Sequence, residues 1–230
     1  MNFANTTGSA GTIIRKANSG ILVKQVTSEK ELSDVFSVRY RVYCLERGYE
    51  RLEDYPNGLE MDEYDPYSIH FIAYVDSLPV GTARLILPNP IGFPVERYCN
   101  VDIRAISPDA NRVAEISRLA VSSEASRGLS ISRGLITAGL IREMYYANKF
   151  LDLGITYAFT AMSKGLERML MRCGICFIKA GASVEYHGIR TPYYVPIKGL
   201  TNWLTQSIFK HHFTQDASLS EKPNSYPLYG

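Results

Sequence analysis

Hydrophobic and polar positions follow two periods along the chain, and the changes between them divide it into strands and helices. Runs rich in β-branched and aromatic residues with a period near two, such as "ILVKQV" and "IHFIAYV", predict strands. The predicted strands are residues 21–26, 69–75, 79–87, 115–121, 155–161, 175–180 and 193–197. Apolar residues three and four apart predict helices at about 28–45, 130–148 and 163–173. The order β-α-β-β-β-α-β-α-β-β predicts a mixed α/β layer architecture.

Local signals place several of the boundaries. Ser28, with Glu31 three residues later, is a capping-box pattern that opens the first helix. Gly174 is placed to end the third helix, because glycine adopts the left-handed conformation that follows many helices. A short turn at 76–78 joins two strands, and a proline-rich connection follows at 88–112.

The length of 230 residues suits one sizeable domain. We expect a flexible lead-in at 1–20, one domain at 21–200, and a C-terminal helix with a flexible tail at 201–230. The segment 200–212 is mildly amphipathic, which indicates packing in the core or at the edge of the domain, with a transient contact with a membrane surface as the alternative.

Composition and charge narrow the class of protein. The chain is 46% hydrophobic and 21% charged, as in soluble globular proteins, and its net charge of +2 does not suggest a nucleic-acid partner. No apolar run approaches 18 residues and the N-terminus lacks the hydrophobic segment of a signal peptide, so we expect no transmembrane helix and a cytoplasmic location. Residues 29–65 hold 11 acidic and 5 basic side chains (net −6), whereas 111–180 hold 10 basic and 5 acidic (net +5). This asymmetry indicates two solvated faces, or a basic docking surface for an acidic partner.

The cysteines do not form a metal-binding pattern. Cys173 and Cys176 make one CxxC, but no second CxxC and no histidine pair at ligand spacing accompanies it. We therefore expect no metal site and interpret the cysteines as reduced structural thiols. His187, in "EYHGIRTPYY", is interpreted as a structural histidine, with a catalytic role as the alternative.

Charged residues stand where the apolar pattern predicts a core. Arg39 and Glu46 fall within the apolar arc of the first helix, and Arg84 interrupts the strand "GTARLIL". In "EISRLAV" (115–121) Glu115 and Arg118 would point to opposite faces of a regular strand, so one of them would be buried. A buried charge is costly unless it is paired. The sequence therefore predicts a buried ionic cluster of Arg39, Arg84 and Arg118 with Glu46, Asp62, Asp65 and Glu115. Because desolvation offsets most of the attraction in such a cluster, function explains it better than stability.

Four ordered stretches resemble a known group of enzymes. They are "RYRVYC" (39–44), "EMDEYD" (60–65), "GTARLILP" (81–88) and "EISRLAV" (115–121). In this order and spacing they resemble the acyl-homoserine-lactone (autoinducer) synthases, which show Arg-x-x-Val-Phe, Asp-x-x-Asp, Gly-x-x-Arg-Leu and Glu-x-Ser-Arg. "VRYRVYCLERGYE", "YDPYSIHFIAY" and "EYHGIRTPYYVP" are more similar still to the long-chain N-acyl amino acid synthases and the acyltransferases associated with the PEP-CTERM/exosortase system. The resemblance covers about 21–198.

The resemblance implies the GNAT-like acyltransferase fold, an α/β (α+β) architecture whose mixed central sheet has a bulged, splayed central strand pair flanked by helices. A bulge in 115–121 would let Glu115 and Arg118 face one cleft. It would also free a backbone N–H near Ser117 to Leu119 to hold the thioester carbonyl as it becomes an oxyanion. Beside the strand 155–161, the splayed strand would leave a slot for pantetheine.

Two departures from the family patterns bear on the substrates. Tyr43 and Tyr49 stand where autoinducer synthases carry Phe and Trp, which weakens the case for S-adenosylmethionine as acceptor. Residues 127–132, Arg-Gly-Leu-Ser-Ile-Ser, carry serines at the two small-residue places of the loop that holds the pyrophosphate of coenzyme A. This favours acyl carrier protein, an acidic protein that delivers pantetheine without that pyrophosphate, over acyl-CoA.

The residue roles follow from the resemblance. Glu115, directly or through water, is the expected general base, with Ser117 and Arg118 as further catalytic residues. The other expected site residues are Arg39, Asp62, Asp65, Arg84 and Leu119 for the acceptor and carbonyl, and Val121, Arg127 and Arg133 for the acyl donor.

The expected activity is transfer of a long-chain acyl group from acyl carrier protein to the α-amine of an amino acid, with no bound cofactor. The acceptor is a small amino acid or amine that the sequence does not identify. The alternatives are an autoinducer-type synthase and a non-catalytic GNAT-like module that binds an acyl carrier protein or lipid.

Overall fold

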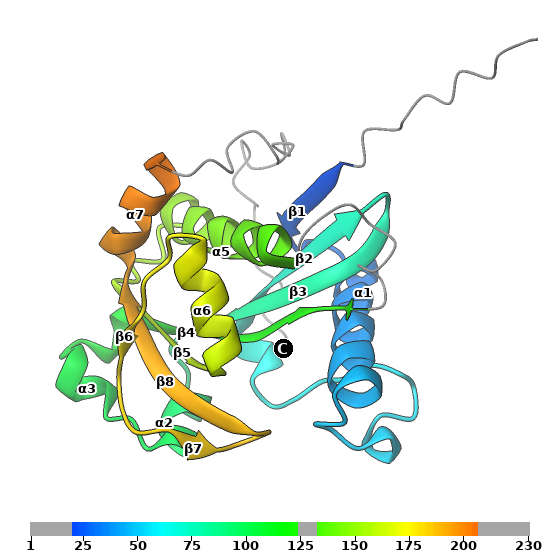
Figure 1. The fold of residues 1–230 in the computed structure, drawn as a ribbon, viewed down its shortest axis with the longest axis horizontal. Helices are drawn as coiled ribbons and strands as arrows, with labels where there is room; N and C mark the ends of the chain where they lie inside the picture. Colours follow the sequence, from blue (N-terminus) through cyan, green and yellow to red (C-terminus); the bar gives the residue numbers. More distant parts are fainter. Residues whose placement is uncertain (1–19, 124–132, 207–230) are drawn as a thin grey trace, which may run out of the picture.

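The computed structural model describes residues 20–123 and 133–206, and its centre is one mixed sheet flanked by helices (Figure 1). The strand order is β1-β2-β3-β4-β5-β8-β6, with β7 paired to β8. All neighbouring pairs are antiparallel except β4 and β5, which are parallel. The predicted mixed α/β class is therefore confirmed.

The strands are β1 (Ile21–Gln25), β2 (Ser68–Val75), β3 (Leu78–Ile86), β4 (Val113–Val121), β5 (Tyr157–Met162), β6 (Ile178–Lys179), β7 (Val184–Glu185) and β8 (Ile189–Pro196). The α-helices are α1 (Glu29–Tyr40), α2 (Pro94–Cys99), α3 (Ile103–Ile106), α5 (Arg133–Phe150), α6 (Lys164–Arg172) and α7 (Ile197–Gln206). Shorter turns are the π-helical η1 (Arg41–Glu46) and the 3₁₀ turns η2 (Leu52–Asp54), η3 (Asp65–Tyr67) and η4 (Ala110–Arg112).

The sheet is covered on both faces because its central strands are apolar on both sides. On β2, Phe71 belongs to the core cluster that contains Ile136 and Leu140 of α5, whereas the next residue, Ile72, packs with Phe36 of α1. Since successive side chains of a strand point to opposite faces, α5 and α1 lie on opposite sides of the sheet (Figure 1). The central strands are thus held between two layers of packed apolar side chains.

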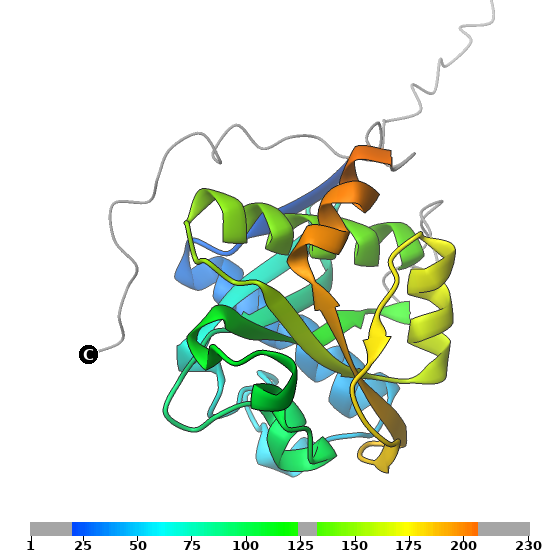
Figure 2. The same ribbon diagram turned by 90° about the vertical axis from the view of Figure 1, so that its left-hand side faces the viewer.

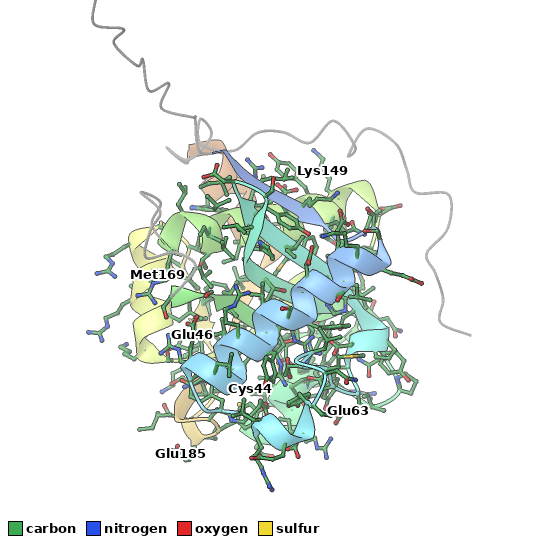
Figure 3. The ribbon with its side chains drawn as sticks, turned by 90° about the vertical axis from the view of Figure 1, so that its right-hand side faces the viewer. Cys44, Glu46, Glu63, Lys149, Met169 and Glu185 are labelled. Carbon is green, nitrogen blue, oxygen red and sulfur yellow. The ribbon has the colours of Figure 1, made fainter. Side chains whose placement is uncertain are left out.

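The first helix begins as the sequence predicts and ends differently. The Ser28 hydroxyl accepts a hydrogen bond from the Glu31 N–H, and the Glu31 carboxylate accepts from the Thr27 N–H, one residue before the donor expected in a capping box. After Tyr40 the α-helix continues as the π-helical turn η1, which carries Cys44 and Glu46 (Figure 3). Such turns are rare and occur often at functional sites.

Several predicted elements need correction. The connection at 88–112 holds two short helices, α2 and α3, which its prolines did not suggest. The expected strand at 175–180 is reduced to the two residues of β6, and the short hairpin of β7 with β8 was not predicted. The start of the helix expected at 130 lies partly outside the described residues, which resume at Arg133.

The C-terminal part of the described chain packs against the rest of the domain (Figure 2). Strand β8 leads directly into α7, where Leu200 and Trp203 join the main core. The Trp203 indole donates a hydrogen bond to the Cys173 carbonyl. The next residue, Gly174, has a φ of +83°, in the left-handed region predicted for a helix end. In the described residues, no helix is both apolar enough and long enough to span a membrane.

Candidate active site

Strand β4 carries a bulge at the position expected from the sequence. Thr82 of β3 pairs with Ala120 and Arg84 pairs with Ser117, so Arg118 and Leu119 together face one residue of β3. Arg118 has a φ of +48°, in the left-handed region that non-glycine residues rarely adopt. The bulge therefore interrupts the alternation of side chains between Glu115 and Arg118, and both line the same cavity.

The bulge coincides with an opening in the sheet. Strand β4 pairs with β5 only from Val113 to Glu115, although both strands continue beyond this point. Their last residues separate, and a cavity of about 770 Å³ lies at the opening. This volume is typical of a site for a small molecule.

The cavity has a polar and an apolar part. Asp62, Arg84, Glu115, Ser117 and Arg118 contribute polar groups. The apolar lining comes mainly from β4, β5 and α6, with Ile116, Leu119, Val121, Met162, Leu166 and Met169. The arrangement can therefore hold a polar reacting centre beside an apolar chain.

One wall of the cavity is backed by a buried ionic cluster. Arg84 donates to both oxygens of Asp62, to Asp65 at 2.6 Å and to the Ser117 hydroxyl at 2.8 Å. Arg118 donates to Glu60 at 2.9 Å and lies 3.0 Å from Asp62. Behind them, Arg39 binds Glu60 and, at 2.6 Å, Asp65.

The cluster keeps two of its carboxylates, Asp65 and Asp62, ionised. Burial opposes ionisation of Asp65, but the guanidinium groups of Arg39 and Arg84 outweigh it and hold the pKa of Asp65 well below its usual range. The pKa of Asp62 is also lowered, because its hydrogen bonds to Arg84 outweigh its burial. Asp62, which lines the cavity, and Asp65 behind it are therefore fixed negative charges.

Glu115 differs from these carboxylates in its environment. It is 2% exposed, and its Oε2 accepts a hydrogen bond from the Val95 N–H at 2.8 Å, in the first turn of α2. Burial raises the pKa of Glu115 to about 8. The hydrogen bond from Val95 and the nearby guanidinium groups lower the pKa, but burial outweighs them. A carboxyl with such a pKa can exchange a proton near neutral pH, as a general base must.

The predicted cluster is wrong in two members. Glu46 lies on η1 away from it and accepts hydrogen bonds from the Ser122 hydroxyl and the Ser123 N–H (Figure 3). Glu115 is bonded to the α2 backbone instead of to a guanidinium group. The carboxylate that joins Arg39 to Arg118 is Glu60, the first residue of the stretch 60–65, and the predicted cluster did not include it.

The structure brings most other predicted site residues to the cavity, in two layers. Asp62, Arg84, Ser117, Leu119, Val121 and Arg133 line it. Arg39 and Asp65, which were expected to contact the acceptor, do not line the cavity. They lie behind it, where Asp65 accepts hydrogen bonds from both Arg39 and the cavity-lining Arg84. Arg127 lies outside the described residues.

One wall of the site was not predicted as a unit, although Tyr43, Tyr49 and His187 were each singled out from the sequence. A row of aromatic rings lines the cavity, together with Glu50 and Arg190. The rings come from η1, the segment just after it, α2 and the β7–β8 turn, and are Tyr43, Tyr49, Tyr98, Tyr186 and His187. The signal that could have identified it is the density of aromatic and charged residues in "EYHGIRTPYY". Within residues 20–123 and 133–206, no group of three or more His, Cys, Asp or Glu side chains is arranged to hold a metal ion.

Comparisons with known proteins agree with this geometry. A family model described as N-acyl amino acid synthase FeeM matches residues 34–172, more than half of the chain. A curated protein of Bacillus subtilis (strain 168), named as a candidate acetyltransferase, is 36% identical over 80 residues, which are 34% of this chain. That match spans half the length of the Bacillus protein.

Solved structures of acyltransferases share the fold. FeeM, an N-acyl amino acid synthase from uncultured soil microbes, matches with a TM-score of 0.61 and 16% identity over 83% of this chain and 95% of its own. The acyl-homoserine-lactone synthase LasI matches with a TM-score of 0.62 and 18% identity over 78% and 91%. BjaI, a CoA-dependent acyl-homoserine-lactone synthase solved with S-adenosylmethionine and isopentyl-CoA, matches with a TM-score of 0.62 and 20% identity over 86% and 94%. The expected acyltransferase fold is thus confirmed.

Proposed function

The chain belongs to the N-acyl amino acid synthase FeeM family, and from this we propose that it transfers a long-chain acyl group from acyl carrier protein to the α-amine of an amino acid. The observation that carries the proposal is the bulged, splayed end of β4, which puts Glu115, the bulge backbone and the ionic cluster around one cavity. A thioester at this opening would have its carbonyl next to the bulge and its acyl chain in the apolar part.

The reaction we propose is direct aminolysis. Glu115, directly or through water, removes a proton from the ammonium group, and the free amine attacks the thioester carbon. A backbone N–H of the bulge, near Ser117 to Leu119, stabilises the oxyanion of the tetrahedral intermediate. The C–N bond forms and the C–S bond breaks, the attacking nitrogen loses its second proton to water, and the proton held by Glu115 passes to the leaving thiolate. No acyl-enzyme is needed.

The preference for a carrier protein over acyl-CoA rests on the surface near the cavity. Arg133 on α5 and Arg172 on α6 are exposed and line the cavity, and Arg168 and Met171 are exposed on the same helix. Acyl carrier protein is acidic, and an arginine-rich rim with an exposed methionine is complementary to an acidic surface with apolar contacts. The exchange of Arg172 for Glu should therefore raise the KM for acyl carrier protein more than the KM for acyl-CoA.

Mass spectrometry of lipid extracts from bacteria that express the wild type or Glu115→Gln tests the function. We expect N-acyl amino acids with the wild type and none above background with the variant, and their masses identify acceptor and chain length. Acyl lactones would instead favour an autoinducer-type synthase. No new lipid would contradict the synthase proposal and leave the binding module, which capture of acyl carrier protein would test.

A further inference from the structure

A continuous row of aromatic rings forms one wall of the cavity. The Tyr43 and Tyr49 centroids lie 6.3 Å apart, and the Tyr49 and His187 centroids lie 5.6 Å apart. Tyr186 is 4.5 Å from His187 and stacks on Tyr98, also at 4.5 Å. Aromatic faces attract cations, so this wall suits a positively charged group.

Glu50 is an additional negative charge at the same wall. The ionic cluster pairs three guanidinium groups, of Arg39, Arg84 and Arg118, with the three carboxylates of Glu60, Asp62 and Asp65. Glu50 is a fourth carboxylate, 3.5 Å from Arg118. With Glu50 included, the three guanidinium groups and four carboxylates have a net charge of −1. A bound ammonium group would neutralise it.

The backbone holds Glu50 beside His187. The Tyr43 carbonyl accepts hydrogen bonds from the N–H groups of both Tyr49 and Glu50, which fixes the chain after η1. The Glu50 Oε1 lies 3.6 Å from the His187 Nε2. His187 has a φ of +51° in the tight turn between β7 and β8, where Gly188 follows at +84°. Left-handed backbone at a non-glycine residue is a feature found often at functional sites.

Arg190 supplies a positive charge over the Tyr49 ring. Its guanidinium carbon lies 5.3 Å from the Tyr49 centroid, and the residue lines the cavity. Arg190 makes no ion pair with any other residue in the described part of the chain. A guanidinium group matches a carboxylate with two parallel hydrogen bonds.

We infer that Glu50 binds the ammonium group of the acceptor, Arg190 binds its carboxylate, and Tyr49 and His187 form the surface between them. Since Glu50 contacts Arg118, an amine at Glu50 lies next to the bulge where the thioester is held. The site is thus a zwitterion site that selects α-amino acids over simple amines. The inference rests on the proposed function and adds the residues that select the acceptor.

The test is a steady-state assay with purified enzyme. The donor is acyl-ACP or acyl-CoA of one chain length, and the rate is followed as release of the donor thiol. Each variant is measured with an α-amino acid that the wild type accepts and with the amine left when its carboxylate is removed. Glu50→Gln should raise the KM for both acceptors about tenfold or more, as expected for loss of a charged partner, while the donor KM stays within about twofold. Arg190→Gln should raise the amino acid KM about tenfold and leave the amine KM within about twofold, so that discrimination is lost.

The controls separate binding from folding. Glu50→Asp keeps the charge and should restore most of the amino acid affinity. Glu53→Gln and Arg104→Gln change exposed residues outside the cavity and should match the wild type. Unchanged acceptor KM values in Glu50→Gln, or an equal loss for both acceptors in Arg190→Gln, would overturn the inference. A wild type that acylates no amino acid with either donor would overturn the proposed function, and the inference with it.

Discussion

The exchange of Glu115 for glutamine tests the buried carboxyl with little change in shape. Glutamine is uncharged like a protonated glutamic acid, and its Oε1 can still accept the hydrogen bond from the Val95 N–H. The variant therefore removes a titration without opening a cavity. Differences from the wild type should depend on pH.

The size of the effect follows from the two pKa values. Burial raises the pKa of Glu115 to about 8 in the folded protein, whereas the ordinary value is 4.5. The unfolded chain releases this proton above pH 4.5, and the folded protein retains it until about pH 8. Wild-type stability is therefore lost as pH rises from 4.5 through 8, by at most about 5 kcal/mol at about 1.4 kcal/mol for each pKa unit.

Urea unfolding at several pH values from 5 to 9 measures this effect. The free energy of unfolding of Glu115→Gln should rise relative to that of the wild type as pH increases, because the variant has no buried carboxyl to ionise. Other groups titrate equally in both proteins and cancel in the difference. Glu53→Gln, which changes an exposed carboxylate, should show no such trend.

Activity gives an independent measurement on the same variant. The wild-type kcat/KM should increase with pH up to about 8, and Glu115→Gln should lose about 10²- to 10⁴-fold. A stability difference constant within about 0.5 kcal/mol from pH 5 to 9 would refute the raised pKa. A variant with full activity would refute the role of Glu115 as the base.

Three further changes test the packing around the site. Glu60→Gln should lower the free energy of urea unfolding by about 3–5 kcal/mol, because it leaves the buried Arg39 and the half-buried Arg118 without their shared carboxylate; a loss below about 1 kcal/mol would contradict the buried cluster. Gly81→Ala should destabilise by about 1–3 kcal/mol in the same assay, since its Cβ would lie 2.9 Å from the Ile136 Cγ2, and an unchanged value would refute that close approach. Ser28→Ala should lower the midpoint of thermal unfolding, followed by circular dichroism, through loss of about 1 kcal/mol of helix capping, whereas an equal midpoint would argue against the cap.

The sequence predicted which charges are buried better than it predicted their partners. Arg39 and Arg84 interrupt apolar patterns, and both are fully enclosed in the structure. The choice of Glu60 over Glu46 depends on the loop before β2, where Asp65 accepts a hydrogen bond from the Asp62 N–H. Such a turn leaves no periodic signal in the sequence, so the pairing could not be derived from it.

The gathering of the aromatic residues into one wall of the cavity was not predicted, for a related reason. Strand β7 has two residues and pairs with the start of β8 through a tight turn. An element this short carries no detectable alternation, and the side chains of the turn are placed by backbone conformation. The bulge in β4, by contrast, was expected from the family resemblance and is present.

The number of residues in the π-helical turn η1 determines where Tyr49 and Glu50 lie at the proposed acceptor site. A π-turn contains one residue more than an α-helix needs over the same rise. Deletion of one residue from Arg41–Glu46 would restore the ordinary α-helical pitch and change how the chain leaves the turn, where the Tyr43 carbonyl accepts hydrogen bonds from the Tyr49 and Glu50 N–H groups. We expect Tyr49 and Glu50 to shift at the cavity wall while α1 and the sheet keep their places. A single-residue insertion or deletion at this turn is therefore a route by which related chains could exchange one acceptor for another without disturbing the thioester side of the fold.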